Sequence, residues 1–191
     1  MAKRSRTGAN GSVKNLKIWT ILCLILVCIA AVALRGFVVY KLYPLEYKDD
    51  IKLISAEYSV DKYYVSAIIC AESHFNAVAV SHQGAVGLMQ IMPDTGEWAA
   101  KNIGIKNYTA DMLSDPDINI TIGCWYLGYL KDLFNGDIRM VTAAYNAGPS
   151  NVQEWMKNSG TLDNIPFEET QNYLETVLLN YDIYKGLYED F

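Results

Sequence analysis

Residues 61–73 read DKYYVSAIICAES, a stretch that predicts a helix with one buried face. Asp61 is a typical N-cap residue, because its carboxylate can accept hydrogen bonds from the N–H groups of the first helical turn. The apolar residues that share the buried face are Val65, Ile68 and Ile69. Glu72 continues the same face, where partial loss of water would raise its pKa and suit it to act as a general acid. The alternative is a solvated glutamate in the last turn.

Helices are predicted on both sides of this stretch. They cover residues 46–58, 93–103, 115–135, 137–147, 149–158 and 168–188. Asp115-Pro116 fits an N-cap followed by proline at the first helical position, and Gly148-Pro149 fits the end of one helix and the start of the next. Residues 77–91 hold two glycines and no helical period, which predicts a loop. Since no pair of alternating strands is long enough for a sheet, we expect one all-α domain over residues 46–191.

Composition and charge narrow the functional classes. The chain has 191 residues, of which 51% are hydrophobic, enough for a domain with a sizeable core and too many for a disordered or collagen-like chain. From residue 46 onward it holds nine basic and 21 acidic residues, a net charge of −12. Nucleic-acid binding depends on neutralising phosphates, so a domain this acidic argues against a nucleic-acid partner.

The N-terminal segment predicts a membrane anchor. Residues 18–34 carry no charge, and apolar character resumes after Arg35 as far as residue 40. A helix over residues 18–40 would span about 35 Å, against a hydrocarbon core of roughly 30 Å. Basic residues in segment 1–17 favour a cytoplasmic N-terminus, which places the acidic domain outside the cell membrane. The alternative is a cleaved signal peptide, since residues 31–33 (AVA) have the small-x-small form. Both a retained anchor and a cleaved signal peptide would export the domain.

Four stretches follow one another in the exported domain. They are ESHFN at 72–76 with SHQGAVGLMQ at 81–90, NITIG at 119–123, AAYNAGP at 143–149 and IPFEET at 165–170. Together they resemble the catalytic domain of soluble lytic transglycosylases, a goose-lysozyme-like family that cuts bacterial peptidoglycan. The resemblance covers roughly residues 48–185 and implies an all-α lysozyme-like fold.

The resemblance also implies the site residues. Glu72 aligns with the single catalytic acid/base of the family. The residues that match the family's substrate-binding positions are Ser81, Met89, Gln90, Tyr145, Asn146 and Glu169. Structural roles are open for some of them: Met89 could fill the core, Tyr145 could be a packed aromatic, and Ser81 could cap a loop.

The family chemistry needs one carboxylate and no cofactor. It implies that Glu72 protonates the β-1,4 bond between N-acetylmuramic acid and N-acetylglucosamine, and that the muramic 6-hydroxyl then closes a 1,6-anhydro ring. One alternative is a true hydrolase, in which Glu169 or Asp94 activates water. Another is a wall-binding module without activity, attached to a secretion, conjugation or division machinery. An active enzyme beside such a machinery is also compatible with the sequence.

The remaining chemistry-bearing residues favour structural roles. His74 and His82 stand eight residues apart without a metal-binding motif around them, so we expect no metal site. Cys70 and Cys124 could form a disulfide or stay as buried free thiols, and the free thiols are favoured. The tryptophans expected in the core are Trp98, Trp125 and Trp155.

Overall fold

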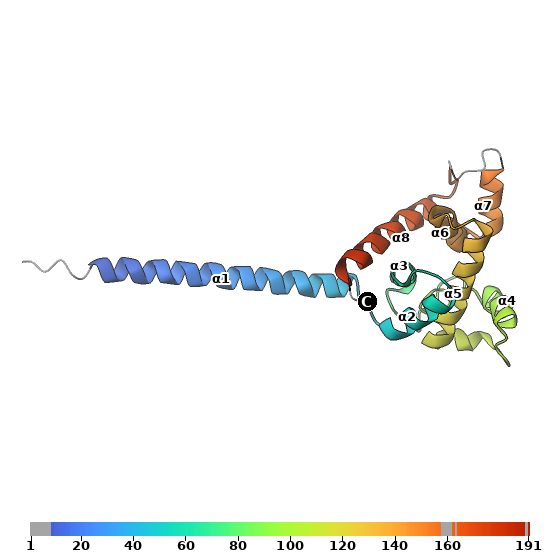
Figure 1. The fold of residues 1–191 in the computed structure, drawn as a ribbon, viewed down its shortest axis with the longest axis horizontal. Helices are drawn as coiled ribbons and strands as arrows, with labels where there is room; N and C mark the ends of the chain where they lie inside the picture. The colour runs from blue at the N-terminus through green and yellow to red at the C-terminus, as the bar shows by residue number, and fades with distance from the viewer. Residues whose placement is uncertain (1–8, 158–161, 163, 190) are drawn as a thin grey trace, which may run out of the picture. The chain divides into compact units, whose positions relative to one another are not determined.

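The computed structural model describes residues 9–157, 162, 164–189 and 191, and its contacts divide the chain between Leu42 and Tyr43. The N-terminal unit is formed by helix α1 (Ala9–Leu42), the long helix of Figure 1. Within it, Ile18–Leu42 is long and apolar enough to cross a membrane. Its 25 residues would extend about 38 Å, more than a hydrocarbon core of roughly 30 Å.

The second unit, Tyr43–Phe191, is all-α, which confirms the predicted fold class. Its helices are α2 (Lys48–Glu57), α3 (Lys62–Ser73), α4 (Pro93–Ile103), α5 (Pro116–Leu133), α6 (Ile138–Ala147), α7 (Pro149–Met156) and α8 (Glu168–Leu187). A short 3₁₀ helix, η1 (Ala110–Ser114), was not predicted. Each predicted helix is present, with no end shifted by more than two residues; residue 158, the predicted end of α7, lies outside the described residues.

Local sequence explains where several helices begin. Asp61 accepts hydrogen bonds from Tyr63 N at 2.8 Å and Tyr64 N at 3.4 Å, and so caps α3 as predicted. Asp115 accepts from Ile118 N at 3.2 Å at the start of α5. These carboxylates satisfy N–H groups that have no partner inside their helices.

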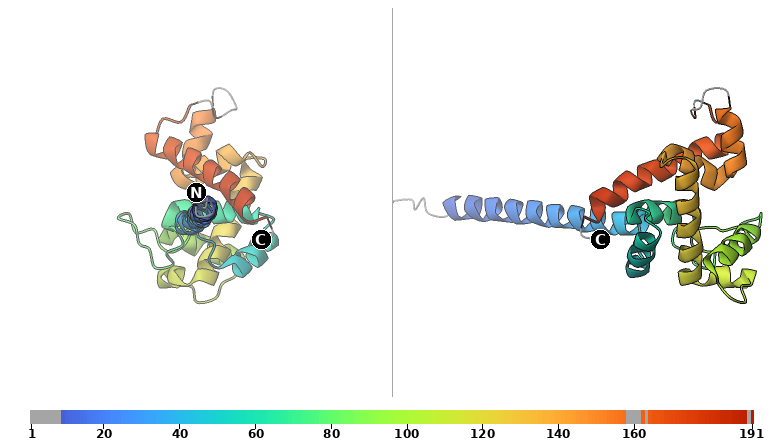
Figure 2. Two further views of the ribbon diagram at one scale, coloured as in Figure 1. Left: turned by 90° about the vertical axis from the view of Figure 1, so that its left-hand side faces the viewer. Right: turned by 45° about the vertical axis from the view of Figure 1, so that its right-hand side comes forward.

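Helix α3 runs through the core. Residues 64–70 are buried without interruption, so the helix is covered on all sides there and not only on the predicted stripe. The reason is that α3 packs against both α2 and α8 (Figure 1), while α6 packs against α8 and α5 (Figure 2). Cys70 and Cys124 are buried thiols that are not joined in a disulfide, as favoured from the sequence.

The segment that opens the second unit is fastened to the end of α8. Tyr184 donates a hydrogen bond to Pro44 O at 2.6 Å, and Tyr188 donates to Tyr43 O at 2.6 Å. Tyr184 is fully buried, and its ring meets that of Tyr43 edge-on at 6.1 Å. Residues 43 and 44 are therefore part of the folded unit and not a loose linker.

The predicted core position of Trp98 is wrong. Its side chain on α4 is 40% exposed, although its ring packs against Trp125 of α5 with centroids 4.7 Å apart. A tryptophan among apolar neighbours in the sequence can thus lie at the rim of a domain, because its ring is large enough to be buried on one face and open on the other.

Candidate active site

Glu72 lies in the last turn of α3, which is followed by the C-cap residue His74 in the left-handed conformation, with φ 51°. Its side chain is half-buried, and Oε1 accepts a hydrogen bond of 2.6 Å from the Tyr173 hydroxyl of α8. Burial raises the pKa of Glu72 to about 7; the Tyr173 bond lowers it and the charge of Glu169 raises it. A carboxyl group with this pKa is present in both its protonated and its ionised form near neutral pH, as acid and base catalysis require.

Glu72 faces a groove of about 430 Å³. The predicted site residues that line it are Glu72, Ser81, Gln90, Tyr145, Asn146 and Glu169. They come from the end of α3, the loop that follows it, the end of α6 and the start of α8. The fold thus brings together side chains that lie up to 97 positions apart in the sequence.

The loop between α3 and α4 is held in place by Asn119 of α5. The Asn119 amide nitrogen donates to Val86 O at 2.9 Å and to Leu113 O at 2.8 Å, and its oxygen accepts from Met89 N at 2.8 Å. Gly87, with φ 84°, makes room for this amide, because an added Cβ would lie 2.2 Å from Asn119 Nδ2. Asn119 was quoted in a sequence motif, but no role had been predicted for it.

The predicted contact of Met89 with substrate needs correction. The Met89 side chain is fully buried, and a Cβ added at Gly123 of α5 would lie 2.1 Å from its sulfur. The side chain therefore fills a slot beside this glycine and does not line the groove. Its backbone still serves the site, since Met89 O accepts the hydrogen bond of the Tyr145 hydroxyl at 2.8 Å.

Ser81 and Gln90 line the groove and also brace the loop. The Ser81 hydroxyl accepts from Ala85 N at 3.0 Å; within the described residues, the structure gives it no bond to Glu72. Gln90 Nε2 donates to Gly87 O at 2.9 Å and to Ala79 O at 3.2 Å. The loop-cap role left open for Ser81 is therefore present, and it does not prevent contact with a ligand.

The start of α8 contributes two residues that sequence reasoning assigned no role. Thr170 donates to Asn146 Oδ1 at 2.7 Å and so fixes the amide beside the groove. Tyr173 is the donor to Glu72, and burial raises its pKa well above the ordinary value, which keeps its hydroxyl protonated. Thr170 ends the motif at residues 165–170, and Tyr173 lies three positions after it. Their place beside this motif was the only sequence signal for them.

Comparison with known proteins identifies the domain. Residues 50–167 match the family model described as the transglycosylase SLT domain. The chain belongs to this family. The family prediction made from the four motifs is thereby confirmed, and the matched residues include Glu72, the loop that follows it and helices α4 to α7.

The SLT domain of this chain is similar to parts of longer proteins. It is 40% identical over 150 residues to the soluble lytic murein transglycosylase of Escherichia coli K12, covering 74% of this chain and 23% of that protein. Membrane-bound lytic murein transglycosylase C of Edwardsiella ictaluri is 34% identical over 123 residues, 56% of this chain and 32% of its own length. The chain thus spans about a quarter to a third of these relatives.

Solved structures show the same likeness. The crystal structure of the 70 kDa soluble lytic transglycosylase of E. coli superposes with a TM-score of 0.72 at 37% identity, covering 75% of this chain and 25% of that one. An inactive glutamate-to-glutamine mutant of the lytic transglycosylase Slt from Pseudomonas aeruginosa superposes with a TM-score of 0.71 at 33% identity, covering 75% and 24%.

Proposed function

We propose that this chain is a membrane-anchored peptidoglycan lytic transglycosylase with Glu72 as its single general acid/base. The observation that supports it most directly is a half-buried glutamate with a pKa of about 7 facing a groove of about 430 Å³. The substrate is the glycan strand of peptidoglycan, and the scissile bond is the β-1,4 bond from N-acetylmuramic acid to N-acetylglucosamine. Both the family and the named relatives support this substrate class.

The first step of the proposed reaction is proton donation. Protonated Glu72 gives its hydrogen to the glycosidic oxygen as the bond from that oxygen to muramic C1 breaks, and the glucosamine end leaves as an alcohol. Positive charge then develops at C1, as an oxocarbenium-like ion or as an oxazolinium formed by the sugar's own acetamido group. Glu72 remains as a carboxylate beside this charge.

The second step returns the proton. The carboxylate of Glu72 takes the hydrogen of the muramic 6-hydroxyl, whose oxygen bonds to C1 and closes the 1,6-anhydro ring. No water is consumed, and Glu72 ends the cycle protonated. Attack from within the same sugar gains the effective concentration of an intramolecular reaction, so a second catalytic carboxylate is not needed.

Tyr145 and Asn146 would orient the reacting sugar. Thr170 holds Asn146 Oδ1, so the amide N–H groups of Asn146 are the ones left to donate to an acetamido oxygen. The Tyr145 hydroxyl donates to Met89 O, which fixes the ring at the groove wall and leaves its oxygen as an acceptor. Glu169 lies at the edge of the same groove and would contact substrate while keeping the pKa of Glu72 high.

Hydrolysis is the competing reaction of the same site. It would need a second carboxylate to activate water, and Glu169 is the candidate because it shares the groove with Glu72. Asp94, the other residue considered from the sequence, lines a separate hollow with Glu97 and Tyr108. Of the two residues considered, Glu169 is therefore the better candidate for the carboxylate that a hydrolase would need to activate water.

The test is digestion of purified peptidoglycan by the full chain in detergent, followed by mass analysis of the released sugars. We expect 1,6-anhydromuramic ends, lighter by one water than hydrolysed ends. Glu72→Gln should lower turnover at least about 100-fold, the lower range of acid–base catalysis. Glu57→Gln, which changes an exposed glutamate of α2, should leave turnover unchanged.

The outcomes separate the alternatives. Hydrolysed ends would replace the transglycosylase with a hydrolase, and no product at all would favour a wall-binding module.

A stability measurement tests whether the loss of activity in Glu72→Gln comes from unfolding. Because the native pKa of about 7 lies above the ordinary value, ionising Glu72 costs the folded state stability as the pH rises. The variant should therefore unfold at a higher temperature than the wild type at pH 8 and at a similar one near pH 4.

A further inference from the structure

Four aromatic rings gather where α4 and α5 meet. We call this set the aromatic strip: Trp98, Trp125, Tyr126 and Tyr129. The Trp98 ring stands edge-on to the rings of Trp125 and Tyr129, with centroids 4.7 and 4.9 Å away. Tyr126 and Tyr129 lie one helical turn apart on α5 with nearly parallel rings, 6.3 Å between centroids.

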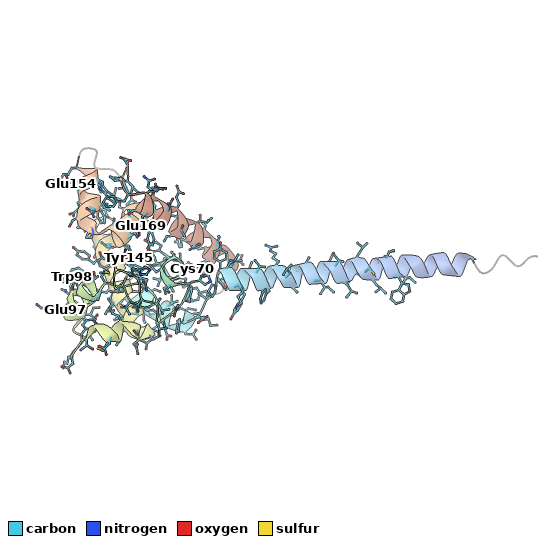
Figure 3. All side chains as sticks on the ribbon, turned by 180° about the vertical axis from the view of Figure 1, so that it is seen from behind. Cys70, Glu97, Trp98, Tyr145, Glu154 and Glu169 are labelled. Atoms are coloured by element: carbon cyan, nitrogen blue, oxygen red, sulfur yellow. The ribbon has the colours of Figure 1, made fainter. Side chains whose placement is uncertain are left out.

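The aromatic strip is continuous with the groove of Glu72. A second hollow of about 190 Å³ shares Gln90, Tyr145 and Asn146 with that groove and is also lined by Tyr126. The ring of Tyr126 lies 5.5 Å from that of Tyr145 and 6.2 Å from that of Trp98. In the view of Figure 3, Tyr145 lies between Glu169 and Trp98. A path of ring contacts thus leads out of the groove along α5.

The outer end of the aromatic strip, formed by Trp98 and Tyr129, is not covered by the other described residues of the domain. Trp98 is 40% exposed and Tyr129 is 38% exposed, whereas Leu127 on the inner side of α5 is fully covered. Met92, which lines both hollows, is also exposed at the start of α4. A contiguous exposed apolar surface next to a groove is typical of a binding surface, since a ligand that covers it removes apolar area from water, which is favourable.

We propose that the aromatic strip is an outer glycan-binding subsite, which holds the peptidoglycan strand beyond the sugars that react at Glu72. The proposal rests on the proposed function. Pyranose rings present flat C–H faces that pack on aromatic rings, while their hydroxyl groups can meet Tyr129 and the indole N–H of Trp98 at the ring edges. A strand that leaves the groove past Tyr145 and Tyr126 would meet these two exposed rings next.

The predicted consequence is a dependence on strand length. A long strand reaches the aromatic strip and gains binding energy there, whereas a short one occupies only the groove. Replacing Trp98 and Tyr129 together by alanine should raise KM about fivefold on long strands, the effect of an aromatic contact worth about 1 kcal/mol. The value of kcat should change little, because these rings lie outside the reacting centre.

The experiment compares full-chain variants in detergent on glycan strands freed of stem peptides and sorted by length. The double variant Trp98→Ala with Tyr129→Ala should match the wild type on the shortest strand that the wild type cleaves. Trp98→Tyr, which keeps an aromatic ring, should restore most of the affinity for long strands. Leu53→Ala, which changes an exposed leucine of α2, should behave as the wild type on every length.

A binding measurement without turnover provides a second readout. In a Glu72→Gln background, long strands should change tryptophan fluorescence, and Trp98→Tyr should remove most of that change. Vesicles of phosphatidylglycerol and phosphatidylethanolamine should give the same change with and without Trp98→Tyr, because Trp19 of the proposed anchor, and not Trp98, would meet the lipid. If Trp98→Tyr removes part of the vesicle response and leaves the strand response intact, the aromatic strip faces lipid and the proposal is wrong.

The two hypotheses fail in different ways. If the wild type releases no sugar from any substrate, the proposed function fails. If it cleaves strands and the double variant keeps the wild-type KM on long strands as well as on short ones, the outer subsite alone is refuted. An equal loss on every strand length would also refute it, because that result indicates damage to the fold or to the groove.

Discussion

Glu72 has two neighbours on α8 that shift its pKa in opposite directions. The Tyr173 hydroxyl donates to Oε1 at 2.6 Å and stabilises the ionised form, while the charge of Glu169 disfavours it. Burial is the largest influence and sets the pKa to about 7. Because Glu169 and Tyr173 stand four positions apart on one helix, a single element adjusts the proton affinity of Glu72, the proposed catalytic acid.

Removing the interaction of Tyr173 or of Glu169 with Glu72 should shift the pH dependence of cleavage in opposite directions. In the proposed role of general acid, Glu72 must be protonated, so activity should fall as pH rises through its pKa of about 7. Tyr173→Phe removes the bond that lowers this pKa and should move the alkaline limb of kcat/KM to higher pH. Glu169→Gln removes the charge that raises it and should move that limb to lower pH. Shifts in the same direction, or no shift, would contradict the proposed control of Glu72.

At the scale of elements, the sequence predicted the helices well because their signals are local. An N-cap such as Asp61 and a Gly-Pro break such as Gly148-Pro149 act within a few residues, and the structure has helix ends at both. The loop over residues 77–91 was predicted as a loop, but its shape was not. Its shape depends on Asn119, which bonds to residues about 30 positions away, and no local pattern reveals such a partner.

The same limit explains the error at Met89. The residue stands between two groove-lining positions in the motif, yet its side chain points to Gly123 of α5, a contact that depends on the packing of distant segments. The family resemblance located the stretch correctly and could not decide which side chains in it face inward. Tyr173 and Thr170 were missed for a related reason, since each acts through a partner on another helix.

The two loop glycines provide a matched pair for testing how the loop is held. Both have positive φ, 87° at Gly84 and 84° at Gly87. An added methyl group at Gly84 meets nothing within 4 Å, whereas at Gly87 it would lie 2.2 Å from Asn119 Nδ2 and 2.3 Å from Leu113 O. Gly84→Ala should therefore cost only the backbone strain, about 1–2 kcal/mol.

Gly87→Ala should cost that strain and the displacement of Asn119 as well, about 1–3 kcal/mol more. Thermal unfolding measures both variants. The gap between them should be several degrees, at about 2–4 °C per kcal/mol for a domain of this size. Gly87→Ala should also lose most cleavage activity, since the loop carries Ser81 and Gln90. Equal melting temperatures for the two variants would show that Asn119 does not fix the loop.

At the scale of the whole molecule, α1 supports the proposed anchor. Ile18–Leu42 has the length and composition of a membrane span, and segment 1–17 carries five of the seven basic residues found before residue 46. The proposed topology has a cytoplasmic N-terminus and the SLT domain outside the cell membrane. Retention of α1, as opposed to cleavage near residues 31–33, is the point on which this topology depends.

Fractionation of cells that express the full chain with a C-terminal tag tests the anchor. We expect the full-length protein in the membrane fraction, resistant to extraction by alkaline carbonate and released by detergent. Protease added outside the cell membrane should digest the domain of a retained, outward-facing protein. A shorter protein that begins after residue 33 and appears in the soluble fraction would show that the segment is a signal peptide. Protection from the protease would reverse the orientation.

The hydrogen bonds from Tyr184 and Tyr188 to residues 43 and 44 have a consequence for where such an enzyme could work. Helix α1 ends at Leu42 and the folded unit begins at Tyr43, so no slack chain separates the two. If α1 is held in the bilayer as proposed, the domain would be tethered there without a spacer and would reach only glycan close to the membrane. An inserted glycine-serine spacer after Leu42 should then let it cleave strands farther away.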